Sequence, residues 1–276
     1  MNTSKPAKRI LFVGAGAWPH KVGQTLLEQS LIQEPVFVSA RKFAAQTQAD
    51  LSNYDLVWIA TTPQLQLNAL KQIGNYSGKI MLEKPLGLNK GEFNDIAEVI
   101  KNRKSSIFLS QPWSFKSNEE LNRLMSDPQK IKKIEIIRSG EVKRDYMAAW
   151  LDWAPHDLYL LAKYLPHQLV DSAIYEVPNS SVGSLGRLNI SLTSGLHISL
   201  SAGFSPERRS EWNLEMASGE IQNLDLHSAK NSLLENGFDS IGSMFDNCFS
   251  AESNPTLINQ LDWQKLAVNE QFQSPT

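Results

Sequence analysis

The first 111 residues alternate between short apolar runs and segments whose apolar residues follow helical spacing. Such runs are typical of buried strands, and here they end in glycine, proline or polar residues that predict tight turns. We expect strands at 10–13, 36–38, 55–60, 79–82 and 107–109, separated by helices over 20–32, 43–48, 65–73 and 93–100. This alternation predicts a parallel sheet with helices on both faces.

The pattern changes after Pro112. A strand is expected at 134–137 and a helix over 150–165, and from residue 168 apolar and polar residues mostly alternate. This period-two stretch predicts strands at 170–177, 188–192, 197–202, 212–216 and 221–226, followed by a helical region over roughly 239–272. The sequence therefore predicts an α/β domain with a doubly wound parallel sheet over 1–112. An α+β domain with a mostly antiparallel, open-faced sheet is expected over 113–276.

The free face of the second sheet is predicted to mediate self-association into a homo-oligomer, a dimer or a tetramer. One face of the sheet is expected to cover the helices of its domain, and the other must be covered or solvated. We expect four apolar residues on that other face: Ile190, Leu192, Ile198 and Leu200.

Composition excludes several classes of protein. The formal net charge is −2, from 27 basic and 29 acidic residues, so no global positive field exists to attract nucleic acid. No apolar run approaches the roughly 20 residues that a membrane-spanning helix needs. The single cysteine, Cys248, allows neither an internal disulfide nor a multi-thiolate metal site. We expect a cytoplasmic protein that binds no nucleic acid, membrane or metal.

Gly14-Ala15-Gly16 follows the first predicted strand and precedes the first predicted helix. Glycines there allow a tight turn and let the backbone approach a pyrophosphate at the helix N-terminus. The third glycine of the dinucleotide-binding pattern is replaced by Pro19. The turn predicts nucleotide binding, although strand–glycine–helix turns also occur as plain structural links.

The end of the second strand indicates which nucleotide is bound. An acidic residue at this place binds the ribose 2′-hydroxyl of NAD, whereas a nearby arginine accommodates the 2′-phosphate of NADP. Here the chain runs Ser39-Ala40-Arg41-Lys42, with two cations and no acid. NADP(H) is therefore favoured over NAD(H), and a solvated basic loop is the alternative.

Two further motifs carry chemistry. Glu83-Lys84-Pro85 follows a buried strand, so Lys84 is expected at the ligand-binding edge of the sheet, unless it is an ordinary surface lysine.

Asp152 and His156 are four residues apart, which on a helix places carboxylate and imidazole on one face. Such an imidazole can move a hydroxyl proton. Because Pro155 disfavours a regular helix before His156, we expect the helix to begin near Pro155, with Asp152 as a possible cap.

Taken together, these motifs resemble the Gfo/Idh/MocA oxidoreductases, named for glucose–fructose oxidoreductase and inositol dehydrogenase. The resemblance covers nearly the whole chain and rests on five segments in order: GAG, SARK, IATTP, LEKPLGLN and LDWAPHDL. It implies a Rossmann domain, a second domain that serves in oligomerisation, and nicotinamide-dependent chemistry on a sugar, nucleotide sugar or cyclic polyol. It also implies that His156 is the general acid/base, Lys84 the lysine of the EKP motif, and Asp152 the acid four residues before the histidine.

The predicted cofactor-binding residues are Gly14, Gly16, Ala17, Trp18, Ser39, Arg41, Lys42, Thr61, Thr62, Glu83 and Lys84. The chain also departs from the family pattern. Tyr159 stands where an acid often follows the histidine, and Ala148-Ala149 replaces a glycine pair. About 40 residues separate Gly14 from Asp55, which is short for two full crossovers and indicates a lost element. A catalytically silent nucleotide-binding regulator on the same fold therefore remains the alternative to an enzyme, with a methyltransferase a distant third.

Overall fold

The computed structural model describes residues 7–43, 48–103, 105–112, 119–141, 144, 146–166, 168–176, 185–226, 233–251 and 257–268. The chain forms two compact units, which are described separately. The first unit comprises residues 1–87, 91–115 and 237–257. The second comprises residues 88–90, 116–236 and 258–276.

The first unit is built on a five-stranded sheet of order β2-β1-β3-β4-β5, in which every neighbouring pair is parallel. Its strands are β1 (Ile10–Val13), β2 (Val36–Val38), β3 (Leu56–Ile59), β4 (Lys79–Leu82) and β5 (Ile107–Leu109). The helices are α1 (Ala17–Glu28), α2 (Ala40–Phe43), α3 (Gln48–Leu51), α4 (Pro63–Gln72), α5 (Lys90–Lys101) and α8 (Leu233–Ser250). The predicted parallel α/β architecture is confirmed.

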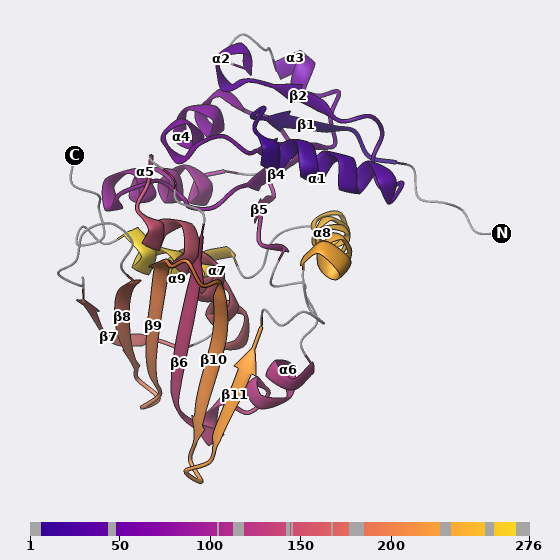
Figure 1. Ribbon diagram of the computed structural model, residues 1–276. Helices are drawn as coiled ribbons and strands as arrows, with labels where there is room; N and C mark the ends of the chain where they lie inside the picture. The colour runs from indigo at the N-terminus through magenta and orange to yellow at the C-terminus, as the bar shows by residue number, and fades with distance from the viewer. Residues whose placement is uncertain are drawn as a thin grey trace. The chain divides into compact units, whose positions relative to one another are not determined.

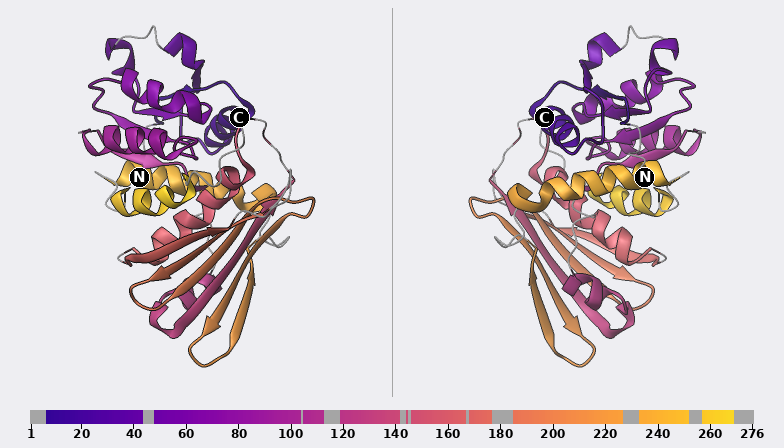
Figure 2. Two further views of the ribbon diagram at one scale, coloured as in Figure 1. Left: turned by 90° about the vertical axis from the view of Figure 1, so that its left-hand side faces the viewer. Right: turned by 90° about the vertical axis from the view of Figure 1, so that its right-hand side faces the viewer.

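Helices cover both faces of this sheet. On one face α1 packs with α8, because Phe12 and Trp58 share a hydrophobic cluster with Leu26 of α1 and Phe245 of α8. Helices α4 and α5 lie on the opposite side of the sheet from α1 (Figures 1 and 2). The prediction placed all of 113–276 in the second domain, but residues 237–257 group with the first unit because the apolar side of α8 completes its core.

The strand order bears on the short spacing between Gly14 and Asp55. A six-stranded doubly wound sheet of order 3-2-1-4-5-6 has a strand outside the second one. In the described part of the first unit, β2 is the edge strand, and the short helices α2 and α3 occupy the chain between β2 and β3. Over the described residues, the short spacing thus coincides with a sheet that has no strand outside β2.

The second unit is built on a six-stranded sheet of order β11-β10-β6-β9-β8-β7, in which only β6 and β9 pair in parallel. Its strands are β6 (Ile131–Gly140), β7 (Val170–Glu176), β8 (Leu185–Leu192), β9 (His197–Phe204), β10 (Arg209–Met216) and β11 (Ile221–Asp225). The helices are α6 (Glu119–Met125), η2 (Pro128–Lys130), α7 (Ala149–Tyr164), α9 (Leu257–Gln264) and η4 (Lys265–Val268). The predicted mostly antiparallel sheet is confirmed.

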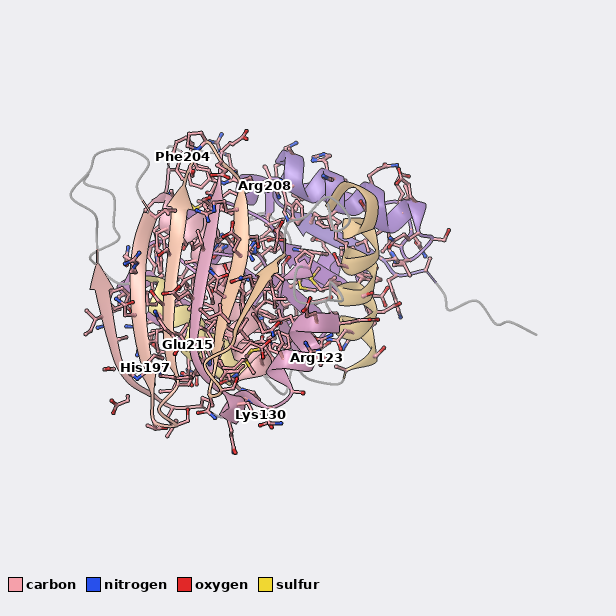
Figure 3. All side chains as sticks on the ribbon, turned by 60° about the horizontal axis from the view of Figure 1, so that its bottom comes forward. Arg123, Lys130, His197, Phe204, Arg208 and Glu215 are labelled. Carbon is pink, nitrogen blue, oxygen red and sulfur yellow. The ribbon has the colours of Figure 1, made fainter. Side chains whose placement is uncertain are left out.

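One prediction about this sheet is wrong. Ile190, Leu192, Ile198 and Leu200 were expected on its free face, but each is at most 3% exposed. They lie on the face that packs against α7, because the apolar set of a period-two strand turns toward the covered side. In Figure 3 the strands of this sheet lie side by side. His197 and Glu215 are labelled near one end of the strands, and Phe204 and Arg208 near the other.

The residues that alternate with this apolar set are polar. Paired positions across four strands place Asn189, Ser199, Glu135 and Asn213 in one row on the other face. This row can be solvated, but the face is not wholly polar: Ile174 of β7, which pairs with Asn189, is 63% exposed, and Ile221 of β11, which pairs with Glu215, is 61% exposed. The homo-oligomer stays a prediction.

The helix predicted over 150–165 is confirmed, whereas its expected start near Pro155 is wrong. The helix begins at Ala149 and runs through Pro155 to Tyr164, so Asp152 lies inside the helix and does not precede it. Eleven of its residues are buried, including Trp150, Leu151 and Ala154 before the proline. Packing of this first part therefore outweighs the backbone hydrogen bond that Pro155 cannot donate.

In the described residues, no helix combines the length and the apolar character that crossing a membrane requires. Over the same residues, no three His, Cys, Asp or Glu side chains are grouped so that they could hold a metal ion.

Cys248 is buried in the core cluster of the first unit, and this burial raises the pKa of its thiol to about 12. The thiol is thus protonated and unreactive at neutral pH.

Candidate functional site

The glycine turn after β1 requires its first glycine. Gly14 has a φ of +137°, and its N–H donates to the carbonyl of Val38 at 2.8 Å. A Cβ atom at this position would lie 2.3 Å from the carbonyl oxygen of Ala60. No side chain fits between these two strand ends, so the turn depends on Gly14.

The start of α1 is open. Gly16 caps the helix with extended backbone and no side-chain hydrogen bond, and a Cβ built there would meet nothing within 4 Å. The first turn contains no acidic residue. Ala17 and Trp18, the first two helical residues, are exposed. Backbone N–H groups and the positive end of the helix dipole are therefore available to an anion at this place.

Pro19 does not disturb this helix start. It is the third residue of α1 and is buried, in the first turn where a backbone N–H has no partner within the helix. The close helix–strand approach that a third glycine normally allows occurs one turn later. A Cβ at Gly23 would lie 2.9 Å from the ring of Phe37. The departure from the glycine pattern therefore leaves a regular helix directly after the turn.

The loop after β2 presents the predicted cations. The hydroxyl of Ser39 accepts a hydrogen bond from the backbone N–H of Lys42 at 3.3 Å, at the start of α2. Arg41 and Lys42 are both exposed. A corresponding loop follows β3, where Thr61 Oγ1 donates to the carbonyl of Thr62 at 3.1 Å and Thr62 caps α4. These five residues follow the carboxyl ends of β2 and β3, the two strands that flank β1. This edge is the ligand-binding edge of such sheets.

Glu83 is the centre of a buried network at the end of β4. It is 8% exposed, and its Oε1 accepts the indole N–H groups of Trp18 at 2.8 Å and of Trp58 at 3.0 Å. Burial raises the pKa of this carboxyl, and the two indole donors and the charge of Lys84 oppose the rise. Gln66, from α4, donates to the backbone carbonyl of Glu83 at 2.7 Å.

Lys84 follows directly on this network. The Lys84–Pro85 peptide bond is cis, and Lys84 is partly buried while Pro85 is buried. Glu83, the residue before Lys84, is held through both its carboxylate and its backbone carbonyl. These contacts fix the backbone from which the Lys84 side chain extends. Trp58 and Gln66 were not among the predicted residues. Their signal in the sequence is weak, since a core tryptophan and a helical glutamine have many other uses.

In the second unit, Asp152 and His156 lie one turn apart on α7. Asp152 is 5% exposed and accepts a hydrogen bond from Arg144 Nε at 2.9 Å. Partial burial lowers the pKa of Arg144, but the charge and hydrogen bond of Asp152 outweigh this and raise it overall. The expected carboxylate–imidazole face is therefore present on the helix, with Arg144 as a third member that the sequence analysis missed.

Trp153 lies beside His156. The two ring centroids are 6.4 Å apart, with the planes tilted by 53°. The indole lies directly over the backbone at the end of β6, where a Cβ at Gly140 would come within 2.1 Å of its ring. The absence of a side chain at Gly140 therefore sets how closely this turn of α7 approaches the sheet.

A buried ion pair anchors the same turn. Asp157 is fully buried and accepts two hydrogen bonds from Arg138 of β6, one of them from Nη2 at 2.9 Å. Trp212 of β10 donates its indole N–H to the same carboxylate at 2.9 Å. Asp157 thus joins the helix to two strands at the residue after His156. The predicted residues fall into two groups, with the turn, Ser39 loop and Lys84 in the first unit and Asp152 and His156 in the second.

No protein-family model matches the chain, and no curated protein matches it in sequence. Solved structures do match over nearly the whole chain. GenD2 from gentamicin A biosynthesis, in complex with NAD, has a TM-score of 0.75 at 12% identity and covers 99% of this chain and 98% of its own. A myo-inositol dehydrogenase from Corynebacterium glutamicum gives 0.72 at 13% identity, covering 95% and 94%.

A third match is the scyllo-inositol dehydrogenase from Lactobacillus casei with bound NAD(H) and scyllo-inositol. Its TM-score is 0.70 at 14% identity, with 96% of each chain covered. Identities this low establish the fold alone. The resemblance read from the sequence motifs is thus confirmed at the level of architecture: this chain has the two-domain fold of the inositol dehydrogenases and related Gfo/Idh/MocA oxidoreductases.

Proposed function

We propose that the chain is a nicotinamide-dependent oxidoreductase that acts on a carbinol or carbonyl carbon of a sugar, nucleotide sugar or cyclic polyol. The observation that carries the proposal is the turn between β1 and α1. It combines a glycine that no other residue could replace with a helix N-terminus that has neither a side-chain cap nor an acid. These features fit the pyrophosphate of a dinucleotide.

The bound dinucleotide would supply or accept the hydride, and the chain would do the rest. His156 is proposed to exchange the proton of the reacting hydroxyl, because a positioned imidazole can act as a general acid or base. Asp152, held by Arg144, orients this end of α7. Lys84 is proposed to hold the reacting oxygen or a ribose hydroxyl through its positive charge.

Arg41 and Lys42 support NADP(H) as the preferred cofactor. Both are exposed on the loop after β2, and the hydroxyl of Ser39 accompanies them. A phosphate dianion forms charge-assisted hydrogen bonds with such a set, whereas a bare ribose diol gains little from it. Two structural neighbours are described with NAD or NAD(H), so NAD(H) remains the cofactor to compare.

The substrate class is proposed from the neighbours. Inositols are cyclic polyols, and another match of the same fold is a UDP-N-acetylglucosamine 3-dehydrogenase, with a TM-score of 0.64 at 13% identity. These neighbours are dehydrogenases of an inositol or of a nucleotide sugar. The first experiment is therefore a fluorescence titration with NADPH and NADH, followed by turnover assays over inositols, sugars and nucleotide sugars.

The decisive test of mechanism uses His156→Asn, with Asp152→Asn and Lys84→Met. Loss of general acid/base catalysis is worth about 10²- to 10⁴-fold in rate, and residues that act as a unit show strongly non-additive losses when combined. His197→Asn is the matched control, because this histidine on β9 is exposed and its Nδ1 lies 3.1 Å from Ser191 Oγ. We expect the control to keep its rate and its melting temperature.

The opposite outcome is also clear. If His156→Asn turns over at the full rate with only its melting temperature lowered, His156 is a structural residue. Binding of NADPH without turnover of any carbohydrate by the unmodified protein would favour a catalytically silent nucleotide-binding regulator.

A further inference from the structure

Helix α7 carries a defect just before His156. Pro155 has no N–H, so the backbone hydrogen bond that would close the helix onto the carbonyl of Leu151 cannot form. The helix nevertheless continues without interruption from Ala149 to Tyr164. The backbone ladder is therefore one hydrogen bond short in the turn that leads into His156.

The C-terminal segment of the second unit contacts this helix. Helix α9 and the following turn η4 lie beside α7 (Figure 1). Four side-chain hydrogen bonds join the segment to α7: Gln264 Nε2 to the Pro155 carbonyl at 2.9 Å, Gln260 Nε2 to Tyr159 Oη at 2.9 Å, Asn259 Nδ2 to the Ala162 carbonyl at 2.8 Å, and Trp150 Nε1 to the Ala267 carbonyl at 2.9 Å.

These contacts are enclosed. Gln264 is 3% exposed and Gln260 is 6% exposed, while Leu261 and Trp263 between them are each 2% exposed. Water therefore has little access to replace a side-chain amide that is lost. Tyr159 stands where the family pattern often has an acid. In this chain its hydroxyl accepts the hydrogen bond from Gln260 of α9.

Two of the four bonds are chemically alike but differ in position. Gln264 and Asn259 each donate a side-chain amide N–H to a backbone carbonyl of α7. The carbonyl of Pro155 belongs to the peptide unit that ends at the nitrogen of His156. The carbonyl of Ala162 lies seven residues further, about 10 Å along the helix at 1.5 Å per residue.

We propose that Gln264 is a positioning residue for His156: its amide is an additional donor to the carbonyl of the Pro155–His156 peptide unit, in the turn where the proline leaves the helical ladder one hydrogen bond short. The proposal rests on the proposed role of His156 in proton transfer. It assigns to the C-terminal segment 257–268 a part in catalysis that is separate from its packing. Displacement of a reacting group by about 1 Å from such a remote change can cost about 10²-fold in rate.

The experiment compares Gln264→Met with Asn259→Leu. Each substitution removes one amide donor to α7 at nearly constant volume. We measure melting temperature, kcat and KM on a substrate found by the turnover screen, and the ¹⁵N shifts of the imidazoles in protein labelled at histidine. The His156 signals are assigned by their loss in His156→Asn.

We expect Asn259→Leu to lose at least as much stability as Gln264→Met, because the Ala162 carbonyl lies in the last turn of α7, where Pro166 has no N–H to replace the lost donor. Gln264→Met should lower kcat by about 10- to 100-fold with KM for the nucleotide unchanged, and it should move the titration curve of the His156 imidazole. Asn259→Leu should keep kcat within about twofold and leave the His156 signals in place. Gln264→Asn, which retracts the amide by one methylene, should fall between the two and serves if the methionine variant does not fold.

Equal losses of kcat in the Gln264 and Asn259 variants, or a folded Gln264 variant with full kcat, would overturn the proposal. Failure of the proposed function appears differently. If His156→Asn keeps its full rate, His156 is not the proton-transfer group. The imidazole shifts then still decide whether Gln264, and not Asn259, sets the environment of His156.

Discussion

Trp18 donates its indole N–H to Oε1 of Glu83 at 2.8 Å across 65 residues of sequence. This contact joins the first turn of α1, where the glycine turn ends, to the residue that precedes Lys84. Trp58 donates to the same oxygen from the core. Two predicted functional elements of the first unit, the dinucleotide turn and the EKP segment, are thus fixed to each other through one carboxylate.

We expect Trp18→Phe to destabilise the protein by about 1 kcal/mol at neutral pH. Hydrogen bonds to charged groups contribute about 1.5–3 kcal/mol, and a smaller value applies here because Trp18 is 38% exposed and water can replace the donor. Urea unfolding measures the change.

Trp153→Phe is the control for this prediction, because the buried Nε1 of Trp153 has no hydrogen-bond partner among the residues that the structure describes. An equal loss in both variants would attribute the effect to ring packing alone.

The ionisation of Glu83 predicts a pH dependence of stability. Burial raises its pKa above the ordinary value of 4.5 in the folded protein. From about pH 4.5 up to the raised pKa, the folded state binds more protons than the unfolded state, so this group lowers stability as pH rises. Glu83→Gln cannot titrate and lacks this contribution.

The measurement for Glu83 is the free energy of unfolding of both proteins between pH 4.5 and 8. The stability of the unmodified protein minus that of Glu83→Gln should decrease as pH rises through this window. A constant difference would mean that Glu83 titrates equally in the folded and unfolded states. In Trp18→Phe the decrease should extend to higher pH, because losing a donor to the carboxylate raises the pKa of Glu83 further.

Much of the first sheet could be predicted because its signal is local. Ile10–Val13 and Leu56–Ile59 are fully buried strands, and a parallel strand covered on both faces is read directly from a continuous apolar run. The glycine turn was predictable for the same reason: one short segment contains the strand end, Gly14 and the helix start.

Other features depend on segments that are far apart in sequence. The apolar side of α8 gives no sign that it completes the core around Phe12 and Trp58. Asp157 is adjacent to His156, yet its partner Arg138 lies on β6 and its second donor Trp212 on β10. Such pairings are set by the register of the sheet. The expected helix start near Pro155 was wrong because a local rule for proline is outweighed by the packing of the residues before it.

Arg41→Ala tests the choice of cofactor. Loss of a charge-assisted hydrogen bond to the 2′-phosphate should weaken NADPH binding by about 1.5–3 kcal/mol. NADH affinity should hardly change, because its ribose carries no phosphate. Titration calorimetry with both nucleotides measures the two effects.

Lys101→Ala, which removes an exposed cation from the end of α5, controls for the general effect of charge. Equal losses for NADPH and NADH in Arg41→Ala would show a structural role for Arg41 and return NAD(H) to first place.

The Arg138–Asp157 pair should dominate the stability of the second unit. Both side chains are at most 3% exposed, so removing one partner leaves a buried charge without compensation, which typically costs about 3–5 kcal/mol. We expect Asp157→Asn and Arg138→Met each to lose stability in this range, with Asp157→Asn the milder because an amide can still accept from Trp212. The double variant should lose far less than the sum of the two, since neither charge remains. Unfolding in urea gives all three values, and strictly additive losses would show that the pair does not act as a unit.

The exposed pair of Lys130 and Asp127, at 3.0 Å, is the comparison: Lys130→Met should change stability by less than about 1 kcal/mol.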